Sequence, residues 1–170
     1  MSRLELAAEP LDEEAFRPFG RVFREPPRPQ DADGPGWRWW GETLELAGDA
    51  RGYGLGYLDL RPVTPAFDWA ERHMRSAELV APLGGDCLVY AGPAEHPDEP
   101  GRAPELERFR AFRVPAGQAV LLAPGVWHGA PFAADGPSAA LVVLASGTGR
   151  EDTHVVRFPE KPVAILPARR

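Results

Sequence analysis

The sequence is short of cysteine, of basic runs and of long hydrophobic segments. Its single cysteine, Cys87, cannot form an internal disulfide, and the apolar run around it is typical of a buried strand rather than of a catalytic thiol. The net charge is −6 and the longest basic run is Arg169–Arg170, so a nucleic-acid-binding surface is not expected. No stretch approaches the roughly 20 apolar residues of a membrane helix. The first residues lack the apolar core of a signal peptide, which favours a cytoplasmic location without membrane contact.

Proline and glycine are abundant instead, with 20 and 18 residues in a chain of 170. Because they follow no repeating period, they indicate many turns. A turn-rich chain of this length favours a sandwich or a barrel over a helix bundle. The length suits one domain, residues 1–170, with a hydrophobic core of its own.

Short apolar or alternating segments, bounded by turn residues, predict a series of β-strands. Strands are expected at 4–8 (a short edge strand), 53–60, 78–83, 86–91, 109–113, 118–122, 138–145 and 153–157. Many short strands at such spacing predict an all-β protein, a jelly-roll barrel of two sheets with a few short helices.

Two N-terminal segments depart from this strand pattern. Residues 11–16 predict one helical turn with Asp12 as its N-cap. The Pro- and Gly-rich segment 25–36 is expected to be a loop. Trp37, Trp39 and Trp40 follow it, and such a cluster is expected in the core or at a subunit interface.

A first segment with chemical character resembles the first motif of the cupins, G-x5-H-x-H-x(3,4)-E-x6-G. It contains Glu71, His73, Glu78 and Gly85, with Glu71 where the first His of the motif stands and Pro65 where the first Gly stands. Residues two apart on a strand face the same side, so Glu71 and His73 are expected to point together into the barrel. Glu78 is expected to point inward as well.

A second segment resembles the second cupin motif, G-x5-P-x-G-x2-H-x3-N. It contains Gly117, Gly125 and His128, with Ala123 in place of Pro and Phe132 in place of Asn. The turn before His128 is expected to set this residue at the start of a strand that faces the first segment. Two imidazoles and one or two carboxylates then form a site that suits Ni, Mn, Fe or Zn better than Ca.

Each of these residues has a plainer interpretation when taken alone. A histidine beside an aromatic residue such as Trp127 is more often a hydrogen-bonded core residue than a ligand, so the metal site is predicted from the agreement of several spaced positions. Arg72 should face away from Glu71 and is expected to form a structural ion pair. His96 lies in an acidic loop and is expected to be solvated, while His154 could support the ligands from behind.

Most of the chain resembles the ureidoglycolate lyase family, formerly called ureidoglycolate hydrolases, of purine (allantoin) degradation. The matching pieces are Leu11–Val22, Glu71–His73, Leu106–Phe112, Gly117–Val120, Gly125–His128 and Pro131–Phe132. Two positions depart from the family pattern: Gly129 stands where a second His is common, and Glu78 stands where the family tends to have Gln.

The resemblance implies a homodimeric carbon–nitrogen lyase that splits a small-molecule substrate, ureidoglycolate, into glyoxylate and urea. His73, Glu78 and His128 are assigned as ligands of a divalent metal such as Ni, with Mn, Fe and Zn as alternatives. Glu71 would be a fourth ligand or the general base, which makes Glu71, His73 and His128 the catalytic set.

Further residues are expected to contact the substrate. The expected lining residues are Glu78, Arg75, Gln118 and Trp127. A cation for the substrate carboxylate is also expected, and it remains open among Arg61, Arg75 and Arg110. The alternatives are another cupin enzyme, such as a dioxygenase or an isomerase, a cupin that only binds a small molecule, and a barrel that has lost its activity.

Overall fold

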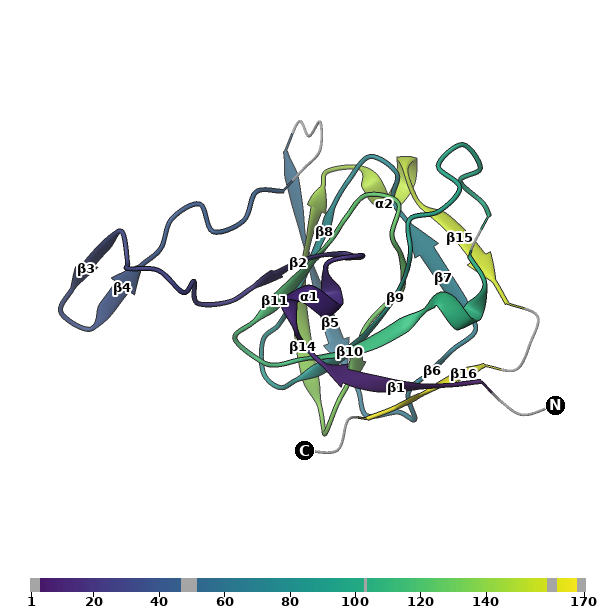
Figure 1. Ribbon diagram of the computed structural model, residues 1–170, viewed down its shortest axis with the longest axis horizontal. Coiled ribbons are helices and arrows are strands. Elements are labelled where there is room, and N and C mark those ends of the chain that lie inside the picture. Colours follow the sequence, from purple (N-terminus) through teal and green to yellow (C-terminus); the bar gives the residue numbers. More distant parts are fainter. Residues whose placement is uncertain (1–3, 47–51, 103, 159–161, 168–170) are drawn as a thin grey trace.

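The computed structural model describes residues 4–46, 52–102, 104–158 and 162–167, and strands are far more common in it than helices (Figure 1). One sheet contains β1 (Glu5–Pro10), β6 (Ala66–Phe67), β7 (Trp69–Arg72), β9 (Cys87–Gly92), β10 (Arg110–Val114), β12 (Trp127–His128), β13 (Phe132–Ala133), β15 (His154–Arg157) and β16 (Val163–Leu166). Their order is β15-β7-β12-β9-β10-β1-β16-β6, and β13 pairs with β9. We call this the nine-stranded sheet.

A second, five-stranded sheet faces it. It contains β2 (Gly20–Phe23), β5 (Tyr53–Leu60), β8 (Glu78–Pro82), β11 (Ala119–Leu122) and β14 (Ser138–Ala145), in the order β2-β11-β8-β14-β5. The helices are short: α1 (Glu13–Phe16), α2 (Thr148–Glu151) and the 3-10 turn η1 (Leu106–Arg108). The protein is therefore all-β, with the cupin-type jelly-roll barrel that the sequence predicts. No helix in the described residues is long and apolar enough to cross a membrane.

The main core lies between the two sheets. Val80 and Val120 point into it from the five-stranded sheet, and Val89 and Phe112 point into it from the nine-stranded sheet. Phe16 of α1 closes one side, with its ring 5.0 Å from that of Phe112. The alternation along each strand thus places one set of apolar side chains inside the barrel.

A second core covers the outer side of the nine-stranded sheet. There Phe67 stacks on Tyr90 with ring centroids 4.0 Å apart, and Trp127 is fully buried nearby in the same cluster. Within this sheet, β1 pairs in parallel with both β10 and β16. The expectation of an edge strand at 4–8 is therefore wrong, because β16, too short to be predicted, continues the sheet beyond β1.

The N-terminal helical turn is confirmed. Asp12 caps α1, since its carboxylate accepts hydrogen bonds of 3.0 Å from the backbone N–H groups of Glu14 and Ala15. The N–H of Ala15, acting against a smaller effect of burial, lowers the pKa of Asp12. The buried strand around Cys87 is confirmed as well, and Cys87 is fully buried.

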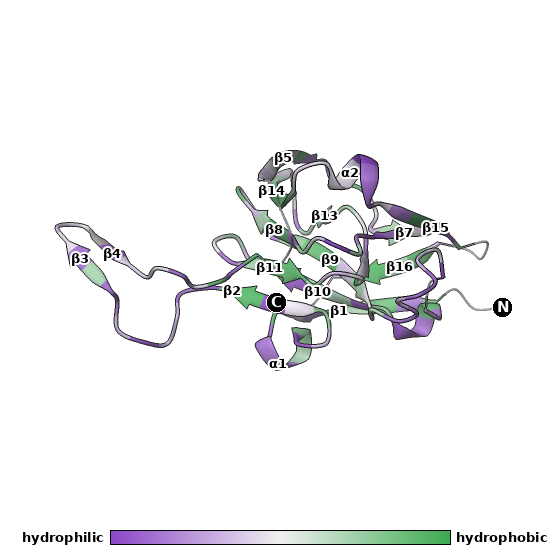
Figure 2. Ribbon diagram, turned by 90° about the horizontal axis from the view of Figure 1, so that it is seen from above, coloured by the Kyte–Doolittle hydropathy of each residue, from purple (hydrophilic) through white to green (hydrophobic). Residues whose placement is uncertain are grey.

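The loop expected at 25–36 is only partly correct. Its end forms β3 (Ala32–Gly34), which pairs with β4 (Trp37–Trp39) in a hairpin that stands away from both sheets (Figures 1 and 2). Trp39 is 59% exposed, so a place in the core is wrong for this residue. Trp40 is half-buried, and its indole N–H donates a 3.0 Å hydrogen bond to the carbonyl of Arg28.

Candidate metal centre

The predicted cluster lies between the two sheets, at one end of the barrel. In the nine-stranded sheet, His128 of β12 is paired directly with Glu71 of β7, so both side chains point to the same side. His73 follows β7 immediately. Glu78 begins β8 in the opposite sheet, between Leu122 and Leu144. The segment that contains Glu71, His73 and Glu78 therefore meets His128 of the second motif, as the sequence pattern predicts.

The distances within the cluster are short. One carboxylate oxygen of Glu78, Oε2, lies 3.1 Å from Nε2 of His73 and 3.4 Å from Nε2 of His128. The two imidazole rings have centroids 5.3 Å apart. One ligand atom each from Glu71, His73 and His128 lie within 4.8 Å of one another, although Glu71 is less buried than the two histidines. Glu78 thus connects the two imidazoles, and Glu71 completes the group.

Backbone carbonyls fix which ring nitrogen faces the centre. Nδ1 of His73 lies 3.0 Å from the carbonyl oxygen of Asp152, and Nδ1 of His128 lies 2.9 Å from that of Val126. A carbonyl oxygen only accepts hydrogen bonds, so both Nδ1 atoms carry a proton and donate it. Both Nε2 atoms are then turned toward Glu78, in the arrangement typical of metal-binding histidines.

This arrangement fits a cation. A neutral imidazole protonated at Nδ1 has a lone pair at Nε2, and the carboxylate of Glu78 also offers only lone pairs, so the cluster needs a proton or a metal ion between its members. Nε2 of His128 is buried, lies 3.4 Å from Oε2 of Glu78 and has no hydrogen-bond partner among the described residues. Two imidazole nitrogens and two carboxylates form a donor set suited to Ni, Mn, Fe or Zn.

The electrostatics of the cluster favour the ionised carboxylate. Burial acts to raise the pKa of Glu78, but the charges that His128 and His73 carry when protonated, together with the 3.1 Å hydrogen bond to His73, outweigh it and lower the pKa to about 2. For His128, burial acts to lower the pKa, but the charge and close contact of Glu78, the hydrogen bond to the carbonyl of Val126 and the charge of Glu71 together outweigh it and raise the pKa. A carboxylate held in this state is suited to bind a cation and is a weak general base.

Asp152 positions the segment that carries His73, and sequence reasoning missed it. Its buried carboxylate accepts hydrogen bonds from the backbone N–H groups of Met74 (3.1 Å) and Arg75 (2.8 Å), while its carbonyl accepts one from His73. His154 lies 3.9 Å from the same carboxylate, which places it behind the cluster. Asp152 lies far from either motif in the chain, so no motif spacing indicates it.

Gly125 joins the two motifs. Gly125 lies three residues before His128 in the chain. Its backbone N–H donates a 2.7 Å hydrogen bond to the carbonyl of His73. Its φ of +82° is a conformation that residues with a side chain rarely adopt. The glycine of the second motif therefore holds the two histidine segments together. Gly85 of the first motif uses no positive φ, so the tight turn after β8 does not depend on it in this way.

Arg72 and Trp127 lie on the opposite side of the sheet from the cluster. Arg72 is fully buried, and its guanidinium donates to the carbonyls of Glu95 (2.6 Å), Glu99 (2.7 Å), Pro100 (2.9 Å) and His96 (3.0 Å). The expected ion pair is therefore wrong, because backbone carbonyls take the place of a carboxylate. Trp127 is fully buried beside Arg72, so it packs in the outer core and does not line the site.

The structure does not bring Gln118 to the cluster. Gln118 precedes β11, whose Leu122 is the residue paired with Glu78, so the two ends are about 13 Å apart along the strand. Arg61 follows β5 at the same far end of the barrel and forms a 3.1 Å ion pair with Asp59. Arg110 shares the sheet face of the cluster, but its Nε and Nη2 donate hydrogen bonds to Glu9 and its Nη1 donates one to the carbonyl of Ala15.

Of the three candidate cations, Arg75 is nearest to the cluster by backbone position, two residues after His73. Its guanidinium is 68% exposed, donates a 3.0 Å hydrogen bond to the carbonyl of Glu151, and lies 3.7 Å from the Asp152 carboxylate.

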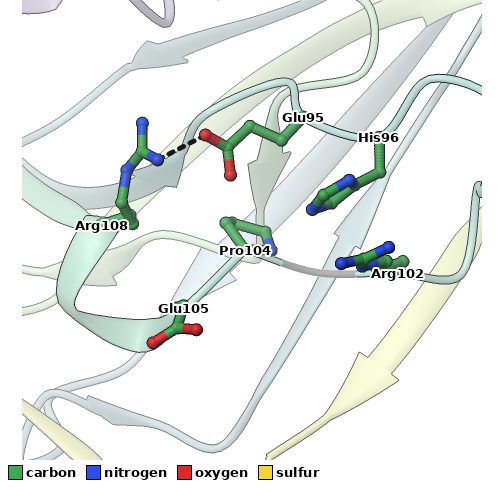
Figure 3. A pocket seen from close by; sticks show the side chains of 6 residues that line it. All are labelled: Glu95, His96, Arg102, Pro104, Glu105 and Arg108. Atoms are coloured by element: carbon green, nitrogen blue, oxygen red, sulfur yellow. Dashed lines mark ion pairs between the residues drawn. The ribbon is translucent and has the colours of Figure 1, made fainter.

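A cavity of about 580 Å³ opens on the outer side of the nine-stranded sheet, away from the cluster (Figure 3). Its lining includes His96, which is half-buried rather than fully solvated, and none of the four clustered residues.

Comparison with known proteins identifies a family. A family model described as Ureidoglycolate lyase matches residues 59–165, which include every residue of the cluster. No curated protein matches the sequence.

Two solved structures have a related architecture. A mutant of the 3,4-ketoisomerase QdtA from Thermoanaerobacterium thermosaccharolyticum, in complex with TDP-4-keto-6-deoxyglucose, is 11% identical, with a TM-score of 0.47 over 78% of this chain and 83% of that chain. A dTDP sugar isomerase from Desulfovibrio desulfuricans is 17% identical, with a TM-score of 0.42 over 83% of this chain and 84% of that chain. Likeness at this level carries no information about activity.

Proposed function

This chain belongs to the ureidoglycolate lyase family, and we propose that it splits ureidoglycolate into glyoxylate and urea at the cluster of Glu71, His73, Glu78 and His128. The observation that supports this best is the buried Nε2 of His128, which points without a hydrogen-bond partner at a carboxylate and a second imidazole. Such a group of acceptors binds a divalent metal, and a metal suits a substrate that carries a carboxylate and a hydroxyl on neighbouring carbons.

The reaction needs a proton to move from oxygen to nitrogen. The substrate hydroxyl loses its proton as the C–O bond becomes the carbonyl of glyoxylate, the C–N bond breaks, and the departing urea nitrogen gains a proton. A divalent ion, when bound, would lower the pKa of the substrate hydroxyl and fix its orientation. His73 and His128 would hold that ion through Nε2, with Glu78 as the carboxylate ligand.

The two carboxylates are suited to different roles. Glu78 is held ionised, with a pKa of about 2, which favours ligation over proton transfer. Glu71 is half-buried, whereas the two histidines of the cluster are buried. We therefore assign to Glu71 the removal of the hydroxyl proton and its delivery to the urea nitrogen.

We further propose that Arg75 binds the substrate carboxylate. Of the three candidate cations, Arg61 is at the far end of the barrel and Arg110 is bound to Glu9. Arg75 lies two residues after His73 in the chain. Its guanidinium is largely exposed, so it can turn from the carbonyl of Glu151 toward the substrate carboxylate. A carboxylate bound in this way would orient the hydroxyl carbon toward Glu71.

The test is the release of urea and glyoxylate from ureidoglycolate by protein loaded in turn with Ni, Mn, Fe and Zn. At least one metal should support turnover that a chelator abolishes, and His128→Ala should remove it. His96→Ala is the matched control, because His96 lies outside the cluster, and it should keep full activity. Absence of urea with every metal would exclude the substrate, and full activity of His128→Ala would exclude the site.

A further inference from the structure

The edge strand β15, which lies beside β7, carries an arginine on the side of the sheet that faces the metal cluster (Figure 1). Val155 is paired with Glu71, and Arg157 is paired with Trp69, so these four side chains share one side of the sheet. Val156, the residue before Arg157, packs in the outer core on the other side. Alternation along the strand therefore turns Arg157 toward the side of the cluster.

Arg157 is available to a ligand. It is exposed and has no hydrogen bond, ion pair or ring contact with any residue that the structure describes. Because Val155 is the direct partner of Glu71, Arg157 is a diagonal neighbour of Glu71. Diagonal neighbours lie about 7–8 Å apart, within reach of a long side chain. No motif contains Arg157, so the sequence does not single it out.

Trp69 lies beside this arginine on the same side of the sheet. It is half-buried, yet it belongs to neither of the two core clusters, whereas the next residue, Ala70, is fully buried in the outer core. The indole therefore offers a flat surface next to an arginine without a partner. A flat ring and a cluster of N–H donors together suit a planar ligand group that carries a hydrogen-bond acceptor.

The opposite sheet has open space on its inner side. The row that contains Glu78 continues through Leu144 to Gly54 on the edge strand β5. A Cβ atom at Gly54 would come no closer than 3.9 Å to any residue other than its chain neighbours, and Gly56, the next inward position of β5, is exposed. Val155, on the inner side of the other sheet, is 53% exposed. The inner sides of both sheets are thus accessible at these edge strands, where a small molecule can approach the cluster.

The order of the groups along β7 matches the order of the groups in ureidoglycolate. Arg75 lies beyond the end of β7, and Arg157 is opposite Trp69, two residues before Glu71, so Glu71 lies between the two arginines. The substrate has its carboxylate at one end, the hydroxyl carbon in the middle and the planar ureido group at the other end. With the carboxylate at Arg75 and the hydroxyl carbon at Glu71, the ureido group comes to lie beside Trp69 and Arg157.

We propose that Arg157 donates hydrogen bonds to the ureido carbonyl oxygen of the substrate, while the planar ureido group packs against Trp69. This inference rests on the proposed reaction and adds the recognition of its leaving group. As the C–N bond breaks, its electron pair leaves with the urea nitrogen and is shared with the ureido oxygen. The electron pair of the hydroxyl O–H bond becomes the second C–O bond of glyoxylate, and Glu71 carries the proton to the nitrogen. A guanidinium at the ureido oxygen binds most strongly while this charge is present, and so favours cleavage.

Two small ligands that lack one group each separate the roles of the two arginines. Hydantoate has the carboxylate and the ureido group without the hydroxyl, and glycolate has the carboxylate and the hydroxyl without the ureido group. Calorimetry with nickel-loaded protein should show that Arg157→Ala weakens hydantoate binding by about tenfold or more and changes glycolate binding by less than about twofold. Arg75→Ala should weaken the binding of both ligands. Trp69→Leu should weaken hydantoate binding by about fivefold and leave glycolate binding unchanged.

Arg21→Ala is the matched control. Arg21 is also exposed, lies on the edge strand β2 and has no partner among the described residues. It is paired with Leu121, whose neighbours Val120 and Leu122 point into the main core, so Arg21 faces away from the barrel interior. This variant should bind both ligands as the wild type does.

Turnover of ureidoglycolate gives a second readout. Arg157→Ala should lower kcat by about 100-fold, as expected for a lost donor to a developing charge, and Arg157→Lys should recover part of the loss. Unchanged hydantoate affinity in Arg157→Ala would overturn the proposal. An equal loss of hydantoate and glycolate binding would overturn it as well, because Arg157 would then bind the carboxylate, and so would a wild type that does not bind hydantoate.

The proposed reaction and the ureido contact can fail separately. A wild type that releases urea, with Arg157→Ala equally active and equally able to bind hydantoate, would overturn the contact alone. A wild type that releases no urea with any metal, but binds hydantoate through Arg157, would overturn the reaction and support the contact.

Discussion

The guanidinium carbon of Arg72 lies 4.5 Å from the ring centroid of Trp127, on the side of the sheet that faces away from the metal cluster. Arg72 directly precedes His73 in the chain, and Trp127 directly precedes His128. The cation–π contact therefore joins, from behind, the two strands that carry the clustered residues. It also fixes the 95–100 loop, whose carbonyls accept the hydrogen bonds of Arg72.

Loss of the Arg72 side chain should destabilise the fold strongly. Arg72→Ala leaves buried carbonyl groups without donors and an empty space over Trp127, so we expect the free energy of unfolding to fall by about 3 kcal/mol. Arg72→Lys keeps the charge but not the planar fork of donors, and should recover less than half of this loss. Urea denaturation followed by tryptophan fluorescence measures both. Arg102→Ala removes an exposed arginine near the same loop and should change stability by less than about 0.5 kcal/mol.

Metal affinity should depend on the clustered histidines and not on the loop histidine. His73→Ala and His128→Ala each remove a proposed ligand, so binding of Ni or Zn should weaken by at least about 100-fold. Competition with a chromophoric chelator measures this affinity. His96→Ala should bind the metal as the wild type does. Equal affinity in all four proteins would place any bound metal outside the cluster.

Asp152 should act on the metal through the segment that it positions. In Asp152→Asn one of the two backbone N–H groups, of Met74 or of Arg75, meets an amide N–H instead of an acceptor, so the segment that carries His73 should loosen. We expect metal affinity to fall by roughly tenfold, as for other residues that orient ligands. Glu151→Gln, one residue away and exposed, should leave the affinity unchanged. An effect on unfolding without any effect on metal affinity would limit Asp152 to a structural role.

Cys87 should be unreactive in the native protein. Burial, with a smaller contribution from the charge of Asp86, raises the pKa of this thiol to about 12. The thiolate is the reactive form, so raising the pKa lowers its population at pH 8, and the fully buried sulfur is also out of reach of reagents. A thiol reagent should label one cysteine per chain in denaturant and almost none in the native state. Fast native labelling would mean that the start of β9, where Cys87 lies, opens readily.

The sequence predicts the strands that are long enough to show a period. β5 and β14 have eight residues each, and their alternating or continuous apolar patterns fix them within a residue or two. β6, β12 and β13 have two residues each, too few for any pattern, and they form because longer neighbours offer them hydrogen bonds. β16 has four and was missed as well, which is why β1 was predicted at an edge.

The sequence also predicts some features of the candidate site and not others. Strand alternation is enough to predict that Glu71 faces the site and that Arg72 faces away. It is not enough to predict what Arg72 meets there, because the four carbonyls come from a loop more than 20 residues later in the chain. Neither motif includes Asp152, whose carbonyl accepts a hydrogen bond from His73 although 79 residues separate the two in the chain.

Gly129 shows why this chain departs from the family pattern at that position. A Cβ atom at Gly129 would lie 1.8 Å from the hydroxyl oxygen of Tyr90, which donates a 2.9 Å hydrogen bond to the carbonyl of Trp69. The tyrosine is fully buried, so it has little room to move aside. A histidine at position 129 is therefore excluded as long as Tyr90 keeps its place.

Gly129→Ala should destabilise the protein by about 3 kcal/mol, the upper range for overpacking a core, and thermal unfolding measures it. The matched control is Gly136→Ala, where a Cβ would meet nothing within 4 Å and φ is not positive, and it should change stability by less than about 0.5 kcal/mol. Tyr90→Leu removes the group in conflict, so in that background Gly129→Ala should cost far less than it does alone. The two substitutions should then show a favourable coupling of at least about 1 kcal/mol. Additive effects would mean that the backbone at Gly129 relaxes away from Tyr90, and that the departure from the family has another cause.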